Sequence, residues 1–339
     1  MRDKENRVQT EDFKEILKII ENAKLNAYRA VNKALIDMYW RVGEYLSIKC
    51  VQSVWGDSFI DETAKFMKEN YPDIKGFNRR GLYRMRQFYE TYKGNKKVSP
   101  LVTQLSWTNH LLILSGAKGI AAKEFYMESC VRENYSKREL ERQIESAYYE
   151  RCMLSAQRLP PAKLRQNRNV RFLDTYVLEF LDMPKDYKEK DLRKAIVNNL
   201  KEFLLEFGKD FSFIGEEYRV QIGNSDFFID MLFYHRELKC MVAIELKVGP
   251  FKPEHIGQMQ FYLEALDRDV KKKDENPSVG LIMCTNKDDT VVEYALSKSL
   301  APSMVSQYEL ALPDKRLLQQ RVMELTQLAD GDGGWDDQE

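Results

Sequence analysis

The chain has 339 residues, of which 43% are hydrophobic and 31% are charged, with only 16 glycines and 10 prolines. This composition excludes a disordered or low-complexity chain and suffices for about two domains of ordinary size. Its apolar runs are far shorter than the roughly 20 residues that cross a bilayer, and its first residues are charged. We therefore expect a cytoplasmic protein with neither a membrane span nor a secretory signal.

The formal net charge is zero because 53 Lys and Arg balance 53 Asp and Glu, yet basic residues gather locally. Residues 75–97 hold eight basic residues and one acidic residue, and residues 151–171 hold six basic residues and no acidic one. Such patches are typical of surfaces that bind nucleic acid. The five cysteines are scattered and never form a C-x-x-C pair, so we expect reduced thiols rather than disulfides or a zinc site.

The first third of the chain has helical periodicity. Apolar residues between 11 and 50 recur at helical spacing and predict two consecutive amphipathic helices. Two further helices, one over 58–70 and one that begins after Asn78 as N-cap, flank a turn with the sequence YPDIKGFN. This order outlines a helix-turn-helix.

Four arginines lie at the start of the second helix of this outline. Arginine suits phosphate contacts, and the aromatic residues between these arginines supply packing or stacking surface. The alternative is a solvated helix that only packs through its aromatic residues. The candidate nucleic-acid-binding residues are Arg79, Arg80, Arg84 and Arg86.

Helical patterning continues over 103–118 and 120–150, where Ser136 and Glu139 have the spacing of a capping box. We therefore expect residues 11–152 to form an all-α, winged-helix or helix-turn-helix-like domain that binds nucleic acid. Residues 153–172 contain a proline pair, many basic residues and little periodicity, and are expected to be a basic linker.

The pattern changes beyond the linker. Helices are expected over 174–182, 189–208 and 253–268, and strands over 216–222, 226–234, 240–248, 279–284 and 303–308. We therefore expect an α/β domain over residues 173–315. Residues 316–339 are expected to form a C-terminal helix followed by an acidic, disordered tail.

Two of these strands carry charged residues in apolar runs. Asp230 lies within FFIDMLFY, and a buried carboxylate requires a cation or a metal to compensate it. Glu245 and Lys247 are two residues apart in MVAIELKV, so they project from the same face of their strand. A short connection predicts an antiparallel hairpin that brings Asp230 beside Glu245. Two carboxylates so placed suit Mg²⁺, although a salt bridge on a half-exposed strand pair is the plainer alternative.

Asp230 followed by Glu245-x-Lys247, with helices before and after, resembles the PD-(D/E)XK nuclease core. The segments GKDFSFIGEEYRV and FFIDMLFYHRELKCMVAIELKVGPFKPEHIGQMQFYLEALD are similar to the YhcG family of nucleases, and WGDSFIDETAKFMKENYPDIKGFNRRGLYRMRQFYETY is similar to that family's N-terminal domain. The resemblance spans roughly residues 11–315. It implies a restriction-endonuclease-like domain with an α-β-β-β-α-β core over 173–315.

The resemblance also implies roles for individual residues. Asp230 and Glu245 would bind the metal, and Lys247 would act on the water or the phosphate. Glu206 would be a third ligand from the helix before the first strand, with Glu202 and Glu217 as alternatives. Gln258 and Tyr262 share one helix face and join the catalytic candidates. The three histidines, His110, His235 and His255, are expected to have no ligand role.

These observations predict a Mg²⁺-dependent nuclease, with Mn²⁺ as a substitute ion, that hydrolyses phosphodiester bonds. DNA is favoured over RNA, and endonuclease over exonuclease activity. The alternative is a catalytically silent nuclease fold that binds DNA or a partner protein. A homodimer is left open.

Overall fold

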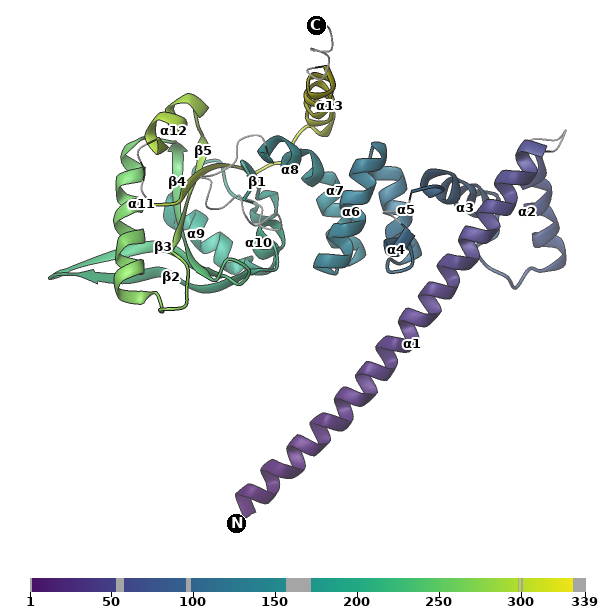
Figure 1. The fold of residues 1–339 in the computed structure, drawn as a ribbon, viewed down its shortest axis with the longest axis horizontal. Coiled ribbons are helices and arrows are strands. Elements are labelled where there is room, and N and C mark those ends of the chain that lie inside the picture. Colours follow the sequence, from purple (N-terminus) through teal and green to yellow (C-terminus); the bar gives the residue numbers. More distant parts are fainter. Residues whose placement is uncertain are drawn as a thin grey trace, which may run out of the picture. The chain divides into compact units, whose positions relative to one another are not determined.

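The computed structural model describes residues 2–52, 58–95, 99–156, 172–297, 299 and 301–331. By their contacts the residues group into two compact units, Met1–Ile144 and Glu145–Glu339 (Figure 1). Among the described residues, no helix combines the length and the apolar character that a membrane span requires. The expected acidic tail after residue 331 lies outside the described residues.

The N-terminal unit begins with one continuous helix, α1 (Arg2–Gln52), where the periodicity predicted two helices. That prediction was wrong because nothing between residues 11 and 42 breaks a helix: the segment has neither proline nor glycine. Gly43 serves packing instead. A Cβ atom there would lie 2.1 Å from the backbone oxygen of Met85, so only glycine lets α1 approach α3 (Arg79–Tyr92) this closely.

Helix α2 (Ser58–Asn70) and α3 flank the turn that the sequence predicted. The side chain of Asn78 accepts a hydrogen bond from the backbone N–H of Gly81, as expected of an N-cap. Leu46, Ile60, Leu82 and Met85 form a buried cluster that holds these helices together.

The remaining helices of the first half are short. Ser136 and Glu139 form the predicted capping box, because each backbone N–H donates to the other residue's side chain. No strand occurs among the described residues of the N-terminal unit, so these residues do not form the β-hairpin of a winged helix. The helices are α4 (Ser99–Val102), α5 (Trp107–Gly116), α6 (Gly119–Glu133), α7 (Lys137–Glu145) and α8 (Tyr148–Ala156), the last of which groups with the C-terminal unit.

The C-terminal unit is built on a six-stranded sheet in the order β1-β6-β5-β4-β3-β2. Strands β2, β3 and β4 pair antiparallel, and β4, β5, β6 and β1 pair parallel. All five predicted strands are present. Their bounds are β1 (Thr175–Val177), β2 (Phe211–Ile222), β3 (Ser225–His235), β4 (Cys240–Pro250), β5 (Val279–Asn286) and β6 (Ser303–Glu309).

The helix predicted over 174–182 was wrong: the segment forms β1 and a 3-10 turn, Glu179–Leu181. A three-residue strand is too short to show a period of two, and its pairing with β6 comes from sequence about 130 residues away. The helix predicted over 189–208 divides into two at Asn199. The helices are α9 (Glu189–Asn198), α10 (Leu200–Phe207), α11 (Glu254–Ala265) with a π-helical extension Leu266–Val270, α12 (Asp289–Leu296) and α13 (Lys315–Gly331).

Helices cover both faces of the sheet (Figure 1). Met259 and Leu263 of α11 belong to the same buried cluster as Leu232, whereas Phe203 and Phe207 of α10 pack against the ring of Phe233. Because neighbouring strand residues point to opposite faces, α11 and α10 lie on opposite sides of β3. The fold is the α-β-β-β-α-β core that the sequence predicted, with β6 and β1 added at the far edge.

Candidate active site

The antiparallel register of β3 and β4 brings the two predicted carboxylates together. Met231 lies opposite Ile244, so the next pair along the ladder is Asp230 and Glu245. Lys247 follows Glu245 on the same face, and its Nζ lies 3.0 Å from Glu245 Oε1. The hairpin prediction is confirmed, and its consequence is a pair of acidic side chains beside an ammonium.

Glu245 is nearly inaccessible, with a side chain only 5% exposed. Its Oε1 accepts hydrogen bonds from Lys247 and from Gln258 Nε2 at 2.8 Å, whereas its Oε2 is buried and has no hydrogen-bond partner. Burial, together with the negative charge of Asp230, raises the pKa of Glu245 above its ordinary range. A buried carboxylate oxygen without a partner beside a second carboxylate fits a divalent cation.

Asp230 is held from two sides. Its Oδ2 accepts the backbone N–H of Leu246 at 2.9 Å, and its Oδ1 accepts a hydrogen bond from Arg193 Nη1 at 2.6 Å. Arg193 comes from α9, and its guanidinium also binds Glu217 Oε1 on β2 at 2.5 Å. One buried arginine therefore neutralises two carboxylates at this end of the sheet.

Arg193 and Glu189 were missed by the sequence interpretation. Glu189, in the first turn of α9, lies 3.9 Å from Lys247 Nζ. Burial by itself would lower the pKa of Lys247, but the carboxylates of Glu245 and Glu189 outweigh it and the pKa is raised. The available signal was the spacing of Glu189 and Arg193, four residues apart and so on one face of a helix whose Leu192 and Ile196 are buried.

Gln258 and Tyr262 also reach the site, from one face of α11. Gln258 Nε2 donates to Glu245 Oε1 and to Tyr262 Oη, the latter at 2.9 Å. Burial raises the pKa of Tyr262, so its hydroxyl stays protonated. The structure thus brings together five of the predicted residues: Asp230, Glu245, Lys247, Gln258 and Tyr262.

Glu206 lies elsewhere. Its side chain is fully buried in an ion pair with Arg151 of α8, and it accepts the backbone N–H of Val177 at 2.9 Å. These contacts engage the carboxylate, so the expectation that Glu206 joins Asp230 and Glu245 does not agree with the structure. Of the two alternatives, Glu217 lies near Asp230 through Arg193, and Glu202 makes no contact with these side chains in the part of the chain that the structure describes.

The histidines have local partners. His110 Nε2 is 2.7 Å from the backbone oxygen of Val102, and burial lowers the pKa of His110 to about 4. The Nδ1 atoms of His235 and His255 accept the backbone N–H groups of Leu238 and Lys252. Within the described ranges, no three His, Cys, Asp or Glu side chains cluster in a way that could hold a metal, so the candidate site rests on two carboxylates.

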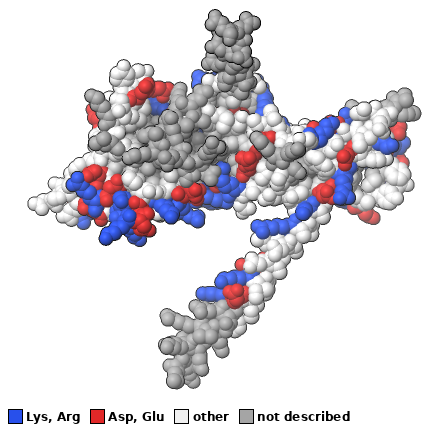
Figure 2. All heavy atoms as spheres, viewed as in Figure 1, with Lys and Arg blue, Asp and Glu red and all other residues white. Residues whose placement is uncertain are grey.

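The four candidate arginines of α3 divide into two pairs. Arg79 binds Asp61 at 2.5 Å and stacks over the ring of Tyr83, and Arg86 binds Glu90 at 2.9 Å. Arg80 and Arg84, four residues apart, form no ion pair with the described residues. On the face drawn in Figure 2, basic and acidic side chains are intermixed over the molecule rather than gathered into one patch.

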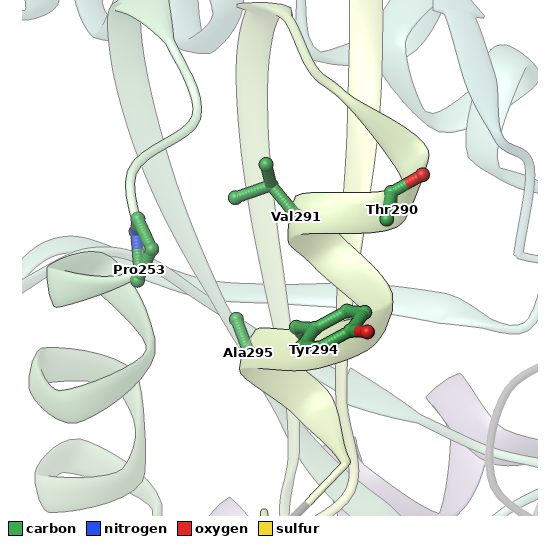
Figure 3. A pocket seen from close by; sticks show the side chains of 5 residues that line it. All are labelled: Pro253, Thr290, Val291, Tyr294 and Ala295. Atoms are coloured by element: carbon green, nitrogen blue, oxygen red, sulfur yellow. The ribbon is translucent and has the colours of Figure 1, made fainter.

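An apolar pocket lies between the start of α11 and α12 (Figure 3). Its lining offers no carboxylate, imidazole, thiol or ammonium, so it lacks the groups that acid-base or metal chemistry requires. We therefore assign the candidate active site to Asp230 and Glu245. The pocket is lined by Pro253, Thr290, Val291, Tyr294 and Ala295.

Comparison with known proteins agrees with this geometry. Residues 169–323 match the model of the YhcG PDDEXK nuclease domain, and residues 15–151 match that of the DUF1016 N-terminal domain. The Escherichia coli (strain K12) protein named "Putative nuclease YhcG" is 30% identical over 356 residues, covering 93% of this chain and 94% of that protein.

Two solved structures are also similar. A repair endonuclease from Pyrococcus abyssi has 17% identity and a TM-score of 0.26 over 38% of this chain and 50% of its own. EndoMS in its apo form has 16% identity and a TM-score of 0.25 over 38% of this chain and 48% of its own. Since family models match both parts of the chain and the bacterial relative matches nearly throughout, the chain belongs to the YhcG family of PDDEXK nucleases.

Proposed function

We propose that the chain is a Mg²⁺-dependent endonuclease that hydrolyses phosphodiester bonds in DNA. The observation that carries this proposal is the buried, unpartnered Oε2 of Glu245, which lies across the β3–β4 ladder from Asp230 and beside Lys247. Membership of a nuclease family supports the same conclusion.

Asp230 and Glu245 would hold the ion, which when bound supplies positive charge next to the scissile phosphate and makes bound water more acidic. Lys247 places its ammonium 3.0 Å from Glu245, where it can orient the attacking water or offset charge that develops on the phosphate. Gln258 fixes the orientation of Glu245 through its 2.8 Å hydrogen bond. In this arrangement Asp230 and Glu245 bind the ion, Lys247 stabilises charge, and Gln258 positions Glu245.

DNA would be bound mainly through the N-terminal unit. Arg80 and Arg84 share one side of α3 and have no ion-pair partner among the described residues, so their charges are available to phosphates. The basic segment 153–172 would add further contacts; most of it lies outside the described residues. We also propose that the chain forms a homodimer.

The test combines cleavage with metal binding. Single-stranded, duplex, flap and four-way DNA, and matching RNA, are incubated with the protein in Mg²⁺ or in EDTA, and Mn²⁺ binding is measured by calorimetry. We expect D230N and E245Q to lose cleavage and to bind Mn²⁺ at least tenfold more weakly. K247A should retain Mn²⁺ binding and lose about 10²–10³ in kcat, the usual effect of removing one electrostatic contact.

The control is D226N, which removes an exposed carboxylate from the same strand, β3, where it pairs with Arg219 at 2.8 Å. It should leave cleavage and Mn²⁺ binding unchanged. If Mn²⁺ binds equally to wild type, D230N and E245Q, the metal site is rejected whatever happens to activity.

The second candidate, a DNA-binding protein without turnover, has one observation in its favour: Asp230 is already neutralised by Arg193. This candidate predicts DNA binding without cleavage in every metal tested. Cleavage that disappears in D230N decides against it.

A further inference from the structure

The N-terminal half of α1 stands apart from the rest of its unit. Every residue from Phe13 to Val31 is exposed, a stretch of 19 residues that extends about 28 Å at 1.5 Å per residue. Contacts with the unit begin at Asn32, which donates hydrogen bonds to the backbone oxygens of Thr103 and Leu105. Figure 1 shows this half of α1 projecting beyond α2 and α3.

The free stretch, together with the next turn up to Leu35, carries an apolar face that one charged residue, Lys24, interrupts. At about 100° per residue, seven large apolar side chains fall within an arc of about 120°, the width of a core-facing helix stripe. Alanines at 23, 27 and 34 fill the spaces between them. The seven residues, which we term the α1 face, are Phe13, Ile16, Leu17, Ile20, Tyr28, Val31 and Leu35, and between 41% and 75% of each is exposed.

The opposite side of the helix is mainly polar, with Lys14, Glu15, Lys18, Asn22 and Arg29, and two exposed apolar side chains, Ile19 and Leu25, lie at its borders. A helix that is polar on one side and apolar on the other gains its stability by burying the apolar side. Nothing in the described part of the N-terminal unit covers the α1 face. A contiguous apolar surface of this extent marks an interaction site.

We propose that the α1 face pairs with the same face of a second copy of this chain, as a two-helix coiled coil. If each of the seven side chains exposes about 100 Å², half of a large side chain, the face offers on the order of 700 Å². A standard protein interface buries about 800 Å² per partner. The face is therefore the size that one stable dimer interface needs.

The charges on the face favour a second copy over an apolar surface. Lys24 is the one charged residue inside the arc, and Glu21 lies at the edge of the arc, about 4.5 Å along the helix axis. In a pair of identical helices, each Lys24 can find a carboxylate on the other copy. Against an apolar partner its ammonium would lose water with only Glu21 of its own helix to compensate the charge. A single polar residue of this kind also fixes the register of a coiled coil.

The dimer is tested on the full chain without nucleic acid or metal, so its failure is distinct from failure of the nuclease proposal. Light scattering after gel filtration should give twice the 39.9 kDa of one chain for the wild type. The double variant L17E/I20E places two carboxylates on the α1 face and should halve the mass. Y28E/V31E, on the same face, provides an independent repeat should the first variant fold poorly.

The matched control is N22E/N26E, which adds two carboxylates at similar spacing on the polar side of the same helix and should remain dimeric. Circular dichroism must show the helix content of each variant unchanged in solution. A wild-type mass of 39.9 kDa overturns the proposal and indicates that the face is covered within one chain. A dimer that persists in both face variants also overturns it.

Discussion

The guanidinium of Arg193 binds Asp230 and Glu217 at 2.6 and 2.5 Å, and its Nε is 3.9 Å from Glu216. A divalent cation bound by Asp230 would carry the same sign of charge into the same place. Asp230 therefore cannot serve both cations fully at once. Glu216 and Glu217, which are more exposed than Asp230, can keep the guanidinium of Arg193 paired when Asp230 binds the ion.

We predict that R193Q binds Mn²⁺ about tenfold more tightly than the wild type. The guanidinium of Arg193 has the same sign of charge as Mn²⁺ and competes with it for Asp230, and a charge this close to a carboxylate typically changes its binding equilibrium by at least one power of ten. Calorimetry on the full chain measures it. R219Q is the control, because Arg219 of β2 pairs with Asp226 of β3 at an exposed position away from Asp230. Weaker binding by R193Q would mean that the arginine holds Asp230 in the orientation the ion requires.

Single residues differed in how far the sequence revealed them. Asp230 and Glu245 stood out because carboxylates are anomalous inside apolar strands. Arg193 and Glu189 did not, since charged residues are ordinary in an amphipathic helix and their partners depend on how α9 packs on the sheet. Glu206 was misassigned for the same reason: its partner, Arg151, precedes it by 55 residues.

At the scale of elements, the junction of α4 and α5 depends on one neutral histidine. Val102 is the last residue of α4, and its backbone oxygen accepts a hydrogen bond from His110 Nε2. His110 is inaccessible, and its Nδ1 is buried without a partner. Protonation would therefore place an unpaired charge in the core of the N-terminal unit.

We predict that this unit loses stability as the pH falls from about 6.5 to about 4. Burial lowers the pKa of His110 to about 4, below the value of about 6.5 in an unfolded chain. In this window the unfolded state binds a proton that the folded state does not, so acid favours unfolding, by about 3 kcal/mol in total.

The comparison is with H110Q, which keeps a donor for Val102 and does not titrate. Urea unfolding followed by tryptophan fluorescence, to which Trp40 and Trp107 of this unit contribute, gives the free energy of unfolding at pH 7 and at pH 4. The wild type should lose about 3 kcal/mol more than H110Q over this interval. Equal losses would show that the imidazole is not held neutral.

Element prediction succeeded where the pattern was local. Strands β2 to β5 carry five or more residues of strand character, and the caps at Asn78 and Ser136 involve side chains only three residues from their partners. The failures were β1, which is created by pairing with β6, and the continuity of α1, because no proline or glycine between residues 11 and 42 divides it into the two predicted helices.

At the scale of the whole molecule, a net charge of zero conceals a local excess of basic residues in the sequence. The basic segment 75–97 includes Arg80 and Arg84, whose charges no described carboxylate neutralises. Where these arginines neutralise phosphates of DNA, the cations condensed on the DNA are released, so binding would depend on salt. We therefore expect the N-terminal unit to provide most of the affinity for DNA, and the candidate active site on β3 and β4 to carry out the hydrolysis.

We predict that R80A/R84A makes the slope of log K against log salt shallower by about two units and weakens binding to all duplex sequences alike. Titrations of labelled duplex at several salt concentrations, in EDTA to prevent cleavage, measure the slope. K65A/K68A removes two basic residues from α2 of the same unit and serves as the control. An unchanged slope in R80A/R84A would place the DNA-binding surface elsewhere.

The buried ion pair of Arg151 and Glu206 has a consequence for the order of synthesis. A ribosome adds about 5–20 residues per second, so Arg151 emerges several seconds before Glu206, 55 residues later. β1, whose Val177 also binds Glu206, must wait longer, because its partner β6 ends at Glu309. The guanidinium of Arg151 thus stays hydrated until Glu206 has been made, and the pairing of β1 with β6 that completes the enclosure waits until the chain has grown to Glu309.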